Sequence, residues 1–355
     1  MIYFKKYATM KYMGEFFLKI KNIIFQNPLL FGMLFLAVFL AGFLAGAFVK
    51  KESELSFSSK NKPERQKSSE YKFTSPLLDC DYFGGPFSIK SNAMKDVVEK
   101  IIENKTKEQK VETVAVYFRD LSNGPTMGIN EAEKFTPASL LKITALISFL
   151  KEAEKNPGFL KEKVVFKETR ENPKDIVLQN IKPQGSLENG KEYSIEELLE
   201  RMIIYSDNQA SNFLLDKFEN ISMEKTFHDL KAGSSLFKED EDFMNIKEYA
   251  SFFRVLYNAS YLSREMSEKA LEILSKVQYK NGLVAKLPKE ISVAHKFGER
   301  GVLGGLYQLH DCGVIYHPSF PYILCVMSKG DNFKELEDVI SSISEEVFRE
   351  VDKGE

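Results

Sequence analysis

The order of apolar and polar positions divides the chain into four parts. Residues 28–49 contain no charged side chain, and residues 50–72 are rich in serine and lysine and poor in apolar residues. After these, apolar side chains recur with the spacing of helices or strands. We therefore expect an N-terminal segment (1–27), a transmembrane anchor (28–49), a disordered linker (50–72) and one folded domain (73–355).

The uncharged segment 28–49 is long enough to cross a bilayer, which takes about 20 apolar residues. Several lysines precede it, which favours a cytoplasmic segment 1–27 and a folded domain outside the cytoplasmic membrane, although Lys50 and Lys51 follow it directly. Ala45-Gly46-Ala47 is similar to a signal-peptidase site, so a cleaved signal peptide is the alternative. The length of both segments favours an uncleaved, single-pass anchor.

Within the folded domain, strands are expected near both ends and helices in the middle. We predict helices at 93–104, 139–150, 194–204, 209–218, 245–257, 266–277 and 332–351, and strands at 111–118, 127–129, 292–296, 306–316 and 322–328. Ser194-x-x-Glu197 and Asn245-x-x-Glu248 are capping boxes that open two of these helices. We expect an α+β fold in which the terminal strands share one sheet, the helical run forms a second lobe, and a site lies between them.

Composition narrows the possible partners. The chain of 355 residues has 49 basic and 51 acidic residues and a formal net charge of −2, so no nucleic acid partner is expected. Its four histidines lack the spacing of zinc ligands, and we propose neither a metal nor an organic cofactor.

The three cysteines, Cys80, Cys312 and Cys325, leave two interpretations open. In the first interpretation, all three cysteines are buried, unreactive thiols. In the second, the last two strands form a hairpin around 317–320, which places Cys312 opposite Cys325 at a distance that a disulfide can bridge. Cys80 is an alternative partner for either.

The first candidate for chemistry is Ser139, three residues before Lys142 at the start of an apolar helix. Residues at this spacing share a helix face. With Thr136 as the N-cap and Pro137 as the first helical residue, Ser139 falls in the first turn, where free N–H groups and the helix dipole stabilise negative charge. A buried lysine beside a serine loses its proton readily and becomes a base.

Two further motifs follow Ser139-x-x-Lys142. Ser206-Asp207-Asn208 lies between two helices, and by itself is typical of a polar turn. Lys296-Phe297-Gly298 ends a strand, and by itself is typical of a strand edge. In this order, and on these elements, the three motifs resemble those of class A β-lactamases and penicillin-binding proteins. The resemblance extends over about residues 73–352 and includes Val116–Asp120, which is similar to the family's first strand.

The resemblance implies a β-lactamase/DD-peptidase-like fold, with a five-stranded antiparallel sheet, flanking helices and an inserted all-helical lobe. It implies that Ser139 is the nucleophile that forms an acyl-enzyme, with Lys142 as its base. It also implies that Ser206 relays a proton to the leaving nitrogen and that Asn208 holds Lys142 and the substrate amide.

The third motif is expected to bind the substrate. By the same resemblance, Lys296 binds the substrate carboxylate and perturbs Ser206. The backbone N–H groups of Ser139 and Glu299 form the oxyanion hole, and Gly298 lets substrate lie along the strand edge.

The chain departs from the family at two places. Phe297 replaces the threonine or serine whose hydroxyl helps to bind the carboxylate. The long loop that carries the deacylating glutamate of class A enzymes is shortened to 234–244, where Glu239, Asp240, Glu241 and Asp242 are most simply a solvated acidic loop.

We therefore expect a membrane-anchored serine hydrolase, β-lactamase-like, which hydrolyses β-lactams slowly because the loop glutamate is missing. One alternative is an enzyme of the D-Ala-D-Ala carboxypeptidase or transpeptidase type, with cell-wall peptide as its substrate. Another is a non-catalytic peptidoglycan-binding module on a membrane tether.

Overall fold

The computed structural model divides the chain into two units, Met1–Asn61 and Lys62–Glu355. Most of the predicted anchor 28–49, all of segment 1–27, and Cys80 lie outside the described residues. Among the residues that are described, no helix is long and apolar enough to span a membrane. The described residues are 36, 39–40, 64–66, 69–79, 87–108, 110–122, 126–169, 185–230, 242–301 and 306–353.

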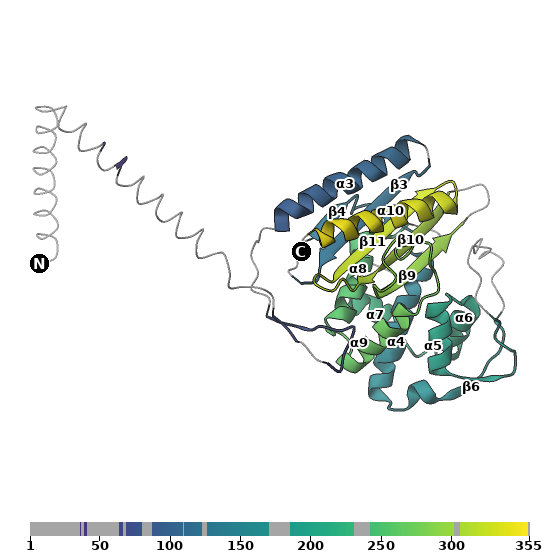
Figure 1. The fold of residues 1–355 in the computed structure, drawn as a ribbon. Helices are drawn as coiled ribbons and strands as arrows, with labels where there is room; N and C mark the ends of the chain where they lie inside the picture. The colour runs from purple at the N-terminus through teal and green to yellow at the C-terminus, as the bar shows by residue number, and fades with distance from the viewer. Residues whose placement is uncertain are drawn as a thin grey trace, which may run out of the picture. The chain divides into compact units, whose positions relative to one another are not determined.

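A five-stranded antiparallel sheet organises the second unit (Figure 1). Its order is β4-β3-β11-β10-β9, so strands from the two ends of the domain pair at its centre, as predicted. β9 lies at one edge. The strands are β3 (Thr113–Asp120), β4 (Thr126–Ile129), β9 (Val293–Arg300), β10 (Tyr307–Ile315) and β11 (Tyr322–Gly330).

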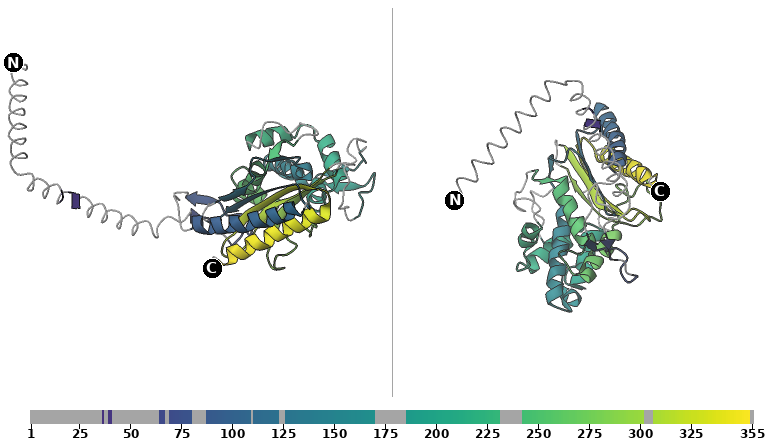
Figure 2. Two further views of the ribbon diagram at one scale, coloured as in Figure 1. Left: turned by 90° about the horizontal axis from the view of Figure 1, so that it is seen from above. Right: turned by 90° about the vertical axis from the view of Figure 1, so that its left-hand side faces the viewer.

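Helices cover both faces of this sheet, which explains why β3, β10 and β11 are buried along nearly their whole length. On one face, α3 (Phe87–Lys107) and α10 (Phe333–Asp352) lie side by side and are joined by an ion pair of Lys105 with Asp338 (Figure 2). On the other face lie α8 (Ile246–Tyr257) and the helical lobe.

The helical lobe is the inserted middle of the chain. Both predicted capping boxes are present, with Glu197 N–H bound to Ser194 Oγ and Glu248 N–H bound to Asn245 Oδ1. The sequence did not predict α7, a single short helix capped by Ser222. The lobe contains the 3₁₀ turn η1 (Ala138–Leu141), α4 (Lys142–Lys155), η2 (Phe159–Lys161), α5 (Ile195–Ile204), α6 (Asn208–Lys217), α7 (Met223–Asp229) and α9 (Arg264–Ser275).

Three two-stranded pairs complete the fold. β5 (Lys134–Phe135) pairs with β8 (Met244–Asn245), and so joins the segment before Ser139 to the start of α8. β6 (Lys163–Val165) pairs with β7 (Glu192–Ser194), which leads directly into α5.

The third pair lies partly in the predicted linker 50–72. β1 (Glu64–Arg65) pairs with β2 (Leu77–Asp79), and the Glu268 carboxylate of α9 accepts the backbone N–H groups of Lys72 and Phe73 at 2.5 and 2.6 Å. The order of the domain therefore begins before residue 73. A polar composition did not reveal this, because the segment is held by backbone hydrogen bonds rather than by apolar burial.

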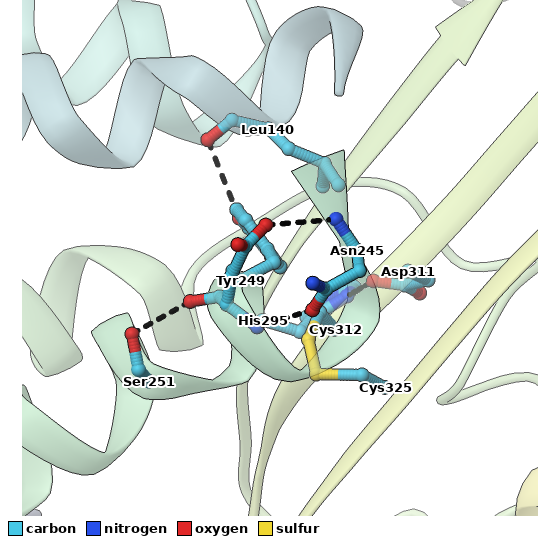
Figure 3. Close-up of a disulfide and its surroundings, with 9 residues drawn as sticks. Leu140, Asn245, Tyr249, Ser251, His295, Asp311, Cys312 and Cys325 are labelled. Atoms are coloured by element: carbon cyan, nitrogen blue, oxygen red, sulfur yellow. Dashed lines mark hydrogen bonds and ion pairs between the residues drawn. A yellow bond between two sulfur atoms is a disulfide. The ribbon is translucent and has the colours of Figure 1, made fainter. Parts of the chain in front are cut away.

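The last hairpin contains the disulfide that the second interpretation of the cysteines predicted. Cys312 on β10 lies directly opposite Cys325 on β11, and the two are joined as a disulfide with a Cα–Cα distance of 4.0 Å (Figure 3). Tyr249 of α8 lies nearby and donates from its buried hydroxyl to the Leu140 carbonyl at 3.3 Å.

Candidate active site

Ser139 lies in the 3₁₀ turn η1, immediately before α4. The N–H of Lys142 bonds back to the carbonyls of Ser139 and Leu140, so the tight turn runs directly into the helix. Side chains three residues apart eclipse in a 3₁₀ turn, which places Ser139 and Lys142 on one face. Ala138, just before the serine, has a φ of +47°, a backbone conformation that costs free energy for a residue with a Cβ and that often occurs at functional sites.

The predicted N-cap role of Thr136 is wrong. Pro137 holds the N-cap position and makes no side-chain cap, whereas the Thr136 hydroxyl donates to Asp242 Oδ1 and accepts from Arg300, both at 2.9 Å. The backbone of Thr136 is bound as well, with its N–H to Gln308 Oε1 and its carbonyl to His310 Nε2, both at 3.1 Å. The hydroxyl that a cap would need is therefore engaged with Asp242 and Arg300.

We call Thr136, Asp242, Arg300, Gln308 and His310 the Thr136 clamp. Asp242 also accepts from Gln308 Nε2 at 2.9 Å and from Lys329 Nζ at 2.5 Å, so it is not part of a solvated acidic loop. His310 is fully buried, and this lowers its pKa to about 4. A neutral imidazole whose Nδ1 accepts the Ser328 N–H donates from Nε2 to Thr136.

Lys142 reaches the second motif. Its Nζ donates to Asn208 Oδ1 and to the Ser206 carbonyl, each at 2.6 Å, and lies 3.3 Å from Ser206 Oγ. Ser206 is buried and has a φ of +55°, so its position also depends on an unfavourable backbone conformation. Ser206 and Ala138, the residue before Ser139, are thus two of the four described non-glycine residues with positive φ, and both lie at the site.

Burial governs the charge of Lys142. It lowers the pKa of the Lys142 ammonium to about 7, while the carboxylates of Asp207 and Glu299 oppose this shift. A large fraction of Lys142 is therefore uncharged at neutral pH and can accept a proton.

Lys296 of β9 approaches the same serine from the sheet. Its side chain is fully buried, and its Nζ lies 3.0 Å from Ser206 Oγ and 2.8 Å from the Phe297 carbonyl oxygen. Burial, together with the charge of Lys142, holds the pKa of Lys296 well below its ordinary value. Ser206 Oγ thus lies between two amines, one from each lobe.

Asp207 holds the turn between α5 and α6 in place. Its carboxylate accepts from Arg201 at 2.9 and 3.1 Å and from the Ala210 N–H at 3.1 Å, which caps α6. The middle residue of Ser206-Asp207-Asn208 therefore fixes the turn, while its neighbours contact Lys142.

Gly298 brings β9 against the turn that carries Ser139. A Cβ at this position would lie 2.7 Å from the Pro137 carbonyl oxygen and 3.1 Å from the Leu140 nitrogen. Taken by itself, the motif allowed this glycine to be a point of close backbone approach, and the structure shows such an approach between β9 and the turn. Its expected role of leaving space for a substrate stays a prediction.

A family model described as the beta-lactamase enzyme family matches residues 94–351. The chain belongs to this family. Beta-lactamase VEB-1 from Pseudomonas aeruginosa is 24% identical over 275 residues, which are 72% of this chain and 90% of that protein. Membership makes the protein an enzyme, a serine hydrolase of the β-lactamase type.

Solved structures with the same fold include two that this chain matches over 97% or more of their own length. A mutant of PBP-A, in an acyl-enzyme complex with penicillin G, is 20% identical, has a TM-score of 0.61 and matches 73% of this chain and 97% of that one. A β-lactamase from Chitinophaga pinensis is also 20% identical, with a TM-score of 0.62 and coverage of 73% and 100%.

This β-lactamase family member keeps Lys142, Ser206, Asn208 and Lys296 in one connected group, and Ser139 on the adjoining turn. The shortened loop is only partly described, since Glu239, Asp240 and Glu241 lie outside the described residues. Within the described ranges, no group of three or more histidine, cysteine or acidic side chains is placed to hold a metal ion.

Sequence reasoning missed the Thr136 clamp and the aromatic neighbour of Phe297, which is Tyr279 at 4.5 Å between ring centroids. It also missed a buried pair of His295 Nδ1 with Asp311 Oδ1 at 2.9 Å. Each joins segments far apart in the chain, and no local spacing indicates such a contact. Strand register could have indicated only the His295–Asp311 pair. Asp311 lies opposite Phe297, and His295 is two residues from Phe297 along β9, so the two side chains share one face of the sheet.

Proposed function

We propose that this enzyme cleaves β-lactam amide bonds by acyl transfer through an ester at Ser139. The observation that carries the proposal is the placement of Ser206 Oγ between Lys142 Nζ at 3.3 Å and Lys296 Nζ at 3.0 Å, next to the Ser139 turn. A cell-wall binding module needs neither a buried base nor a proton relay. The buried amine pair thus favours catalysis over the non-catalytic alternative.

In the first half-reaction, uncharged Lys142 removes the hydroxyl proton of Ser139 as the oxygen attacks the carbonyl carbon. The N–H groups of Ser139 and Glu299 stabilise the oxyanion. As the C–N bond breaks, Ser206 gives its proton to the leaving nitrogen and regains one from Lys142. The product is an ester on Ser139 and a free amine.

In the second half-reaction, water hydrolyses the ester and returns the proton to Ser139. We expect this step to be slower than acylation, because the sequence lacks the loop glutamate that activates the water in class A enzymes. If water attack is slow enough, the enzyme behaves as a penicillin-inhibited peptidase that acts on D-Ala-D-Ala ends. We further propose that residues 28–49 anchor the domain outside the cytoplasmic membrane.

Turnover of a chromogenic cephalosporin by the full chain tests the proposal. We expect slow ring opening in the wild type and none with Ser139→Ala or Lys142→Met. An initial burst of about one equivalent per enzyme would show that deacylation limits the rate. Ring opening that survives Ser139→Ala would contradict the assigned nucleophile.

A further inference from the structure

Phe297 occupies the middle of the Lys-x-Gly motif, where relatives place a carboxylate-binding hydroxyl. Its ring is 1% exposed and packs against Tyr279, which is 3% exposed, with the ring centroids 4.5 Å apart and the planes tilted by 34°. Two rings therefore fill the space beside the motif, and neither offers a hydrogen-bond donor to an anion there. The Tyr279 hydroxyl lies 3.4 Å from Glu337, which orients it toward a carboxylate of the protein itself.

Lys296, the cation of the same motif, is surrounded by protein. Its Nζ lies 3.0 Å from Ser206 Oγ, 2.8 Å from the Phe297 carbonyl oxygen and 4.1 Å from the centroid of the Phe297 ring, and the residue is 0% exposed. The negative face of an aromatic ring is an electrostatic partner for an ammonium group. Phe297 thus stands at Lys296 where a bound carboxylate would otherwise stand.

Lys296 is a poor partner for a substrate carboxylate whether or not its amine is charged. If the amine is protonated, the ring, the carbonyl and the serine already surround it. If burial beside Lys142 leaves the amine uncharged, which its lowered pKa favours, it offers an anion no charge at all. Beside the uncharged amine, a substrate carboxylate would lose its hydration without gaining an ionic partner, and that is unfavourable. Beside the ammonium, it would have to displace partners that Lys296 already has.

Two other cations near this strand are already bound. Arg300, at the end of β9, donates to Thr136 Oγ1 at 2.9 Å. Lys280, next to Tyr279, donates to the Val277 carbonyl at 2.7 Å and is exposed. Arg300 is half-buried and Lys280 is exposed, so Lys280 is the more accessible of the two cations to an anion from solvent.

We propose that this enzyme selects acyl substrates that are uncharged at the position where its relatives bind a carboxylate, namely lactams or peptide amides bearing an ester or amide there, and that Phe297 determines this selectivity. The proposal rests on the proposed function, because it concerns the substrate of the Ser139 ester. Phe297 acts by occupying the anion position beside Lys296.

The test compares penicillin G with its uncharged methyl ester on the full chain. The rate constant of covalent acylation is measured for each compound by intact-mass spectrometry. We expect the methyl ester to acylate at least as fast as the free acid. Phe297→Thr should shift the ratio of the two rate constants at least tenfold toward the acid, and Lys280→Met should leave it unchanged.

Phe333→Thr is the matched control, because it breaks another close aromatic pair, with Tyr307 at 4.7 Å, outside the motif. It should leave the ratio as in the wild type. A wild type that reacts faster with the free acid than with the ester overturns the inference but leaves the Ser139 chemistry standing. Absence of acylation by either compound instead overturns the proposed function.

An ester preference that Phe297→Thr does not change would remove the assignment to Phe297. If that variant does not fold, Tyr279→Leu is the second variant. Removing the ring that packs on Phe297 should then move the ratio toward the acid. The ratio in the unmodified enzyme tests the substrate class without any variant.

Discussion

Two amines and one hydroxyl determine the chemistry at the scale of single residues. Ser206 Oγ lies within 3.3 Å of Lys142 Nζ and at 3.0 Å from Lys296 Nζ. Two ammonium groups this close to one buried oxygen repel each other, which favours loss of a proton from one of them. Burial lowers the pKa of both lysines, and the charge of Lys142 lowers the pKa of Lys296 further.

The acylation rate should therefore depend on pH through Lys142. Its pKa of about 7 means that the amine is protonated and inactive as a base below this pH, and uncharged above it. We expect the acylation rate constant to rise about tenfold per pH unit below pH 7 and to level off above it. The measurement is the initial rate of adduct formation between pH 5 and 9. A flat profile would contradict the role of Lys142 as the base.

At the scale of elements, two contacts hold the Ser139 turn in place. β9 meets it from the sheet at Gly298, and the Thr136 clamp holds the segment that leads into it. Both lie outside the reactive groups. We predict a separate effect on the position of Ser139 for the loss of each contact.

Gly298→Ala should slow acylation strongly. The new Cβ would lie 2.7 Å from the Pro137 carbonyl oxygen, so the turn and the strand must separate. A displacement of about 1 Å at a reacting group can cost on the order of 100-fold in rate. Gly330→Ala is the matched control, because Gly330 lies on β11 and its new Cβ would lie 3.1 Å from the Lys110 carbonyl oxygen. This variant should keep the wild-type rate. Equal rates in both variants would refute the role given to Gly298.

Thr136→Val should lower the acylation rate about tenfold, because it removes the hydroxyl that joins Asp242 to Arg300. The midpoint of the pH profile should stay in place, since Lys142 is untouched. Thr136→Ser keeps the hydroxyl and should restore the rate. If the midpoint moves with the rate, the clamp acts on the charge of the site rather than on its position.

At the scale of the whole molecule, the disulfide joins the two strands beneath the site. Cys312 is opposite both Cys325 on β11 and Lys296 on β9. Closing a loop between residues 13 apart stabilises a fold by up to about 3 kcal/mol through the unfolded state.

Reduction should therefore lower the thermal unfolding temperature of the full chain. The comparison is a melting curve with and without dithiothreitol. The double variant Cys312→Ala/Cys325→Ala should melt at the lower temperature in both conditions. A wild type that melts identically with and without the reductant would show that the bond does not contribute to stability.

Much of the fold could be predicted from local pattern. Alternation and helical spacing located the five strands of the sheet and the helices at its ends, and the Ser194 and Asn245 capping boxes are present. Counting offsets around one hairpin offered the Cys312–Cys325 pairing as one of two interpretations, and the structure shows this pairing. Short elements such as α7 have too little periodic signal to be predicted.

The candidate site was predictable only in part, because its motifs are local and its supports are not. Ser139-x-x-Lys142 and Ser206-Asp207-Asn208 are visible as spacings. The contacts of Thr136 join residues more than 100 positions apart, and a local cap was the simplest interpretation for a threonine before a helix. The role of Phe297 likewise depends on Tyr279, which comes close only in the folded chain.

Acyl transfer through Ser139 is tested most directly by an intact-mass time course of the full chain with penicillin G and with its methyl ester, beside the Ser139→Ala variant. We expect a covalent adduct with at least one of the two compounds, mapped to the peptide that contains Ser139 and absent from the variant. Slow loss of the adduct would accompany hydrolysis. An adduct on Ser139→Ala, or none on the wild type with either compound, would contradict acyl transfer through Ser139.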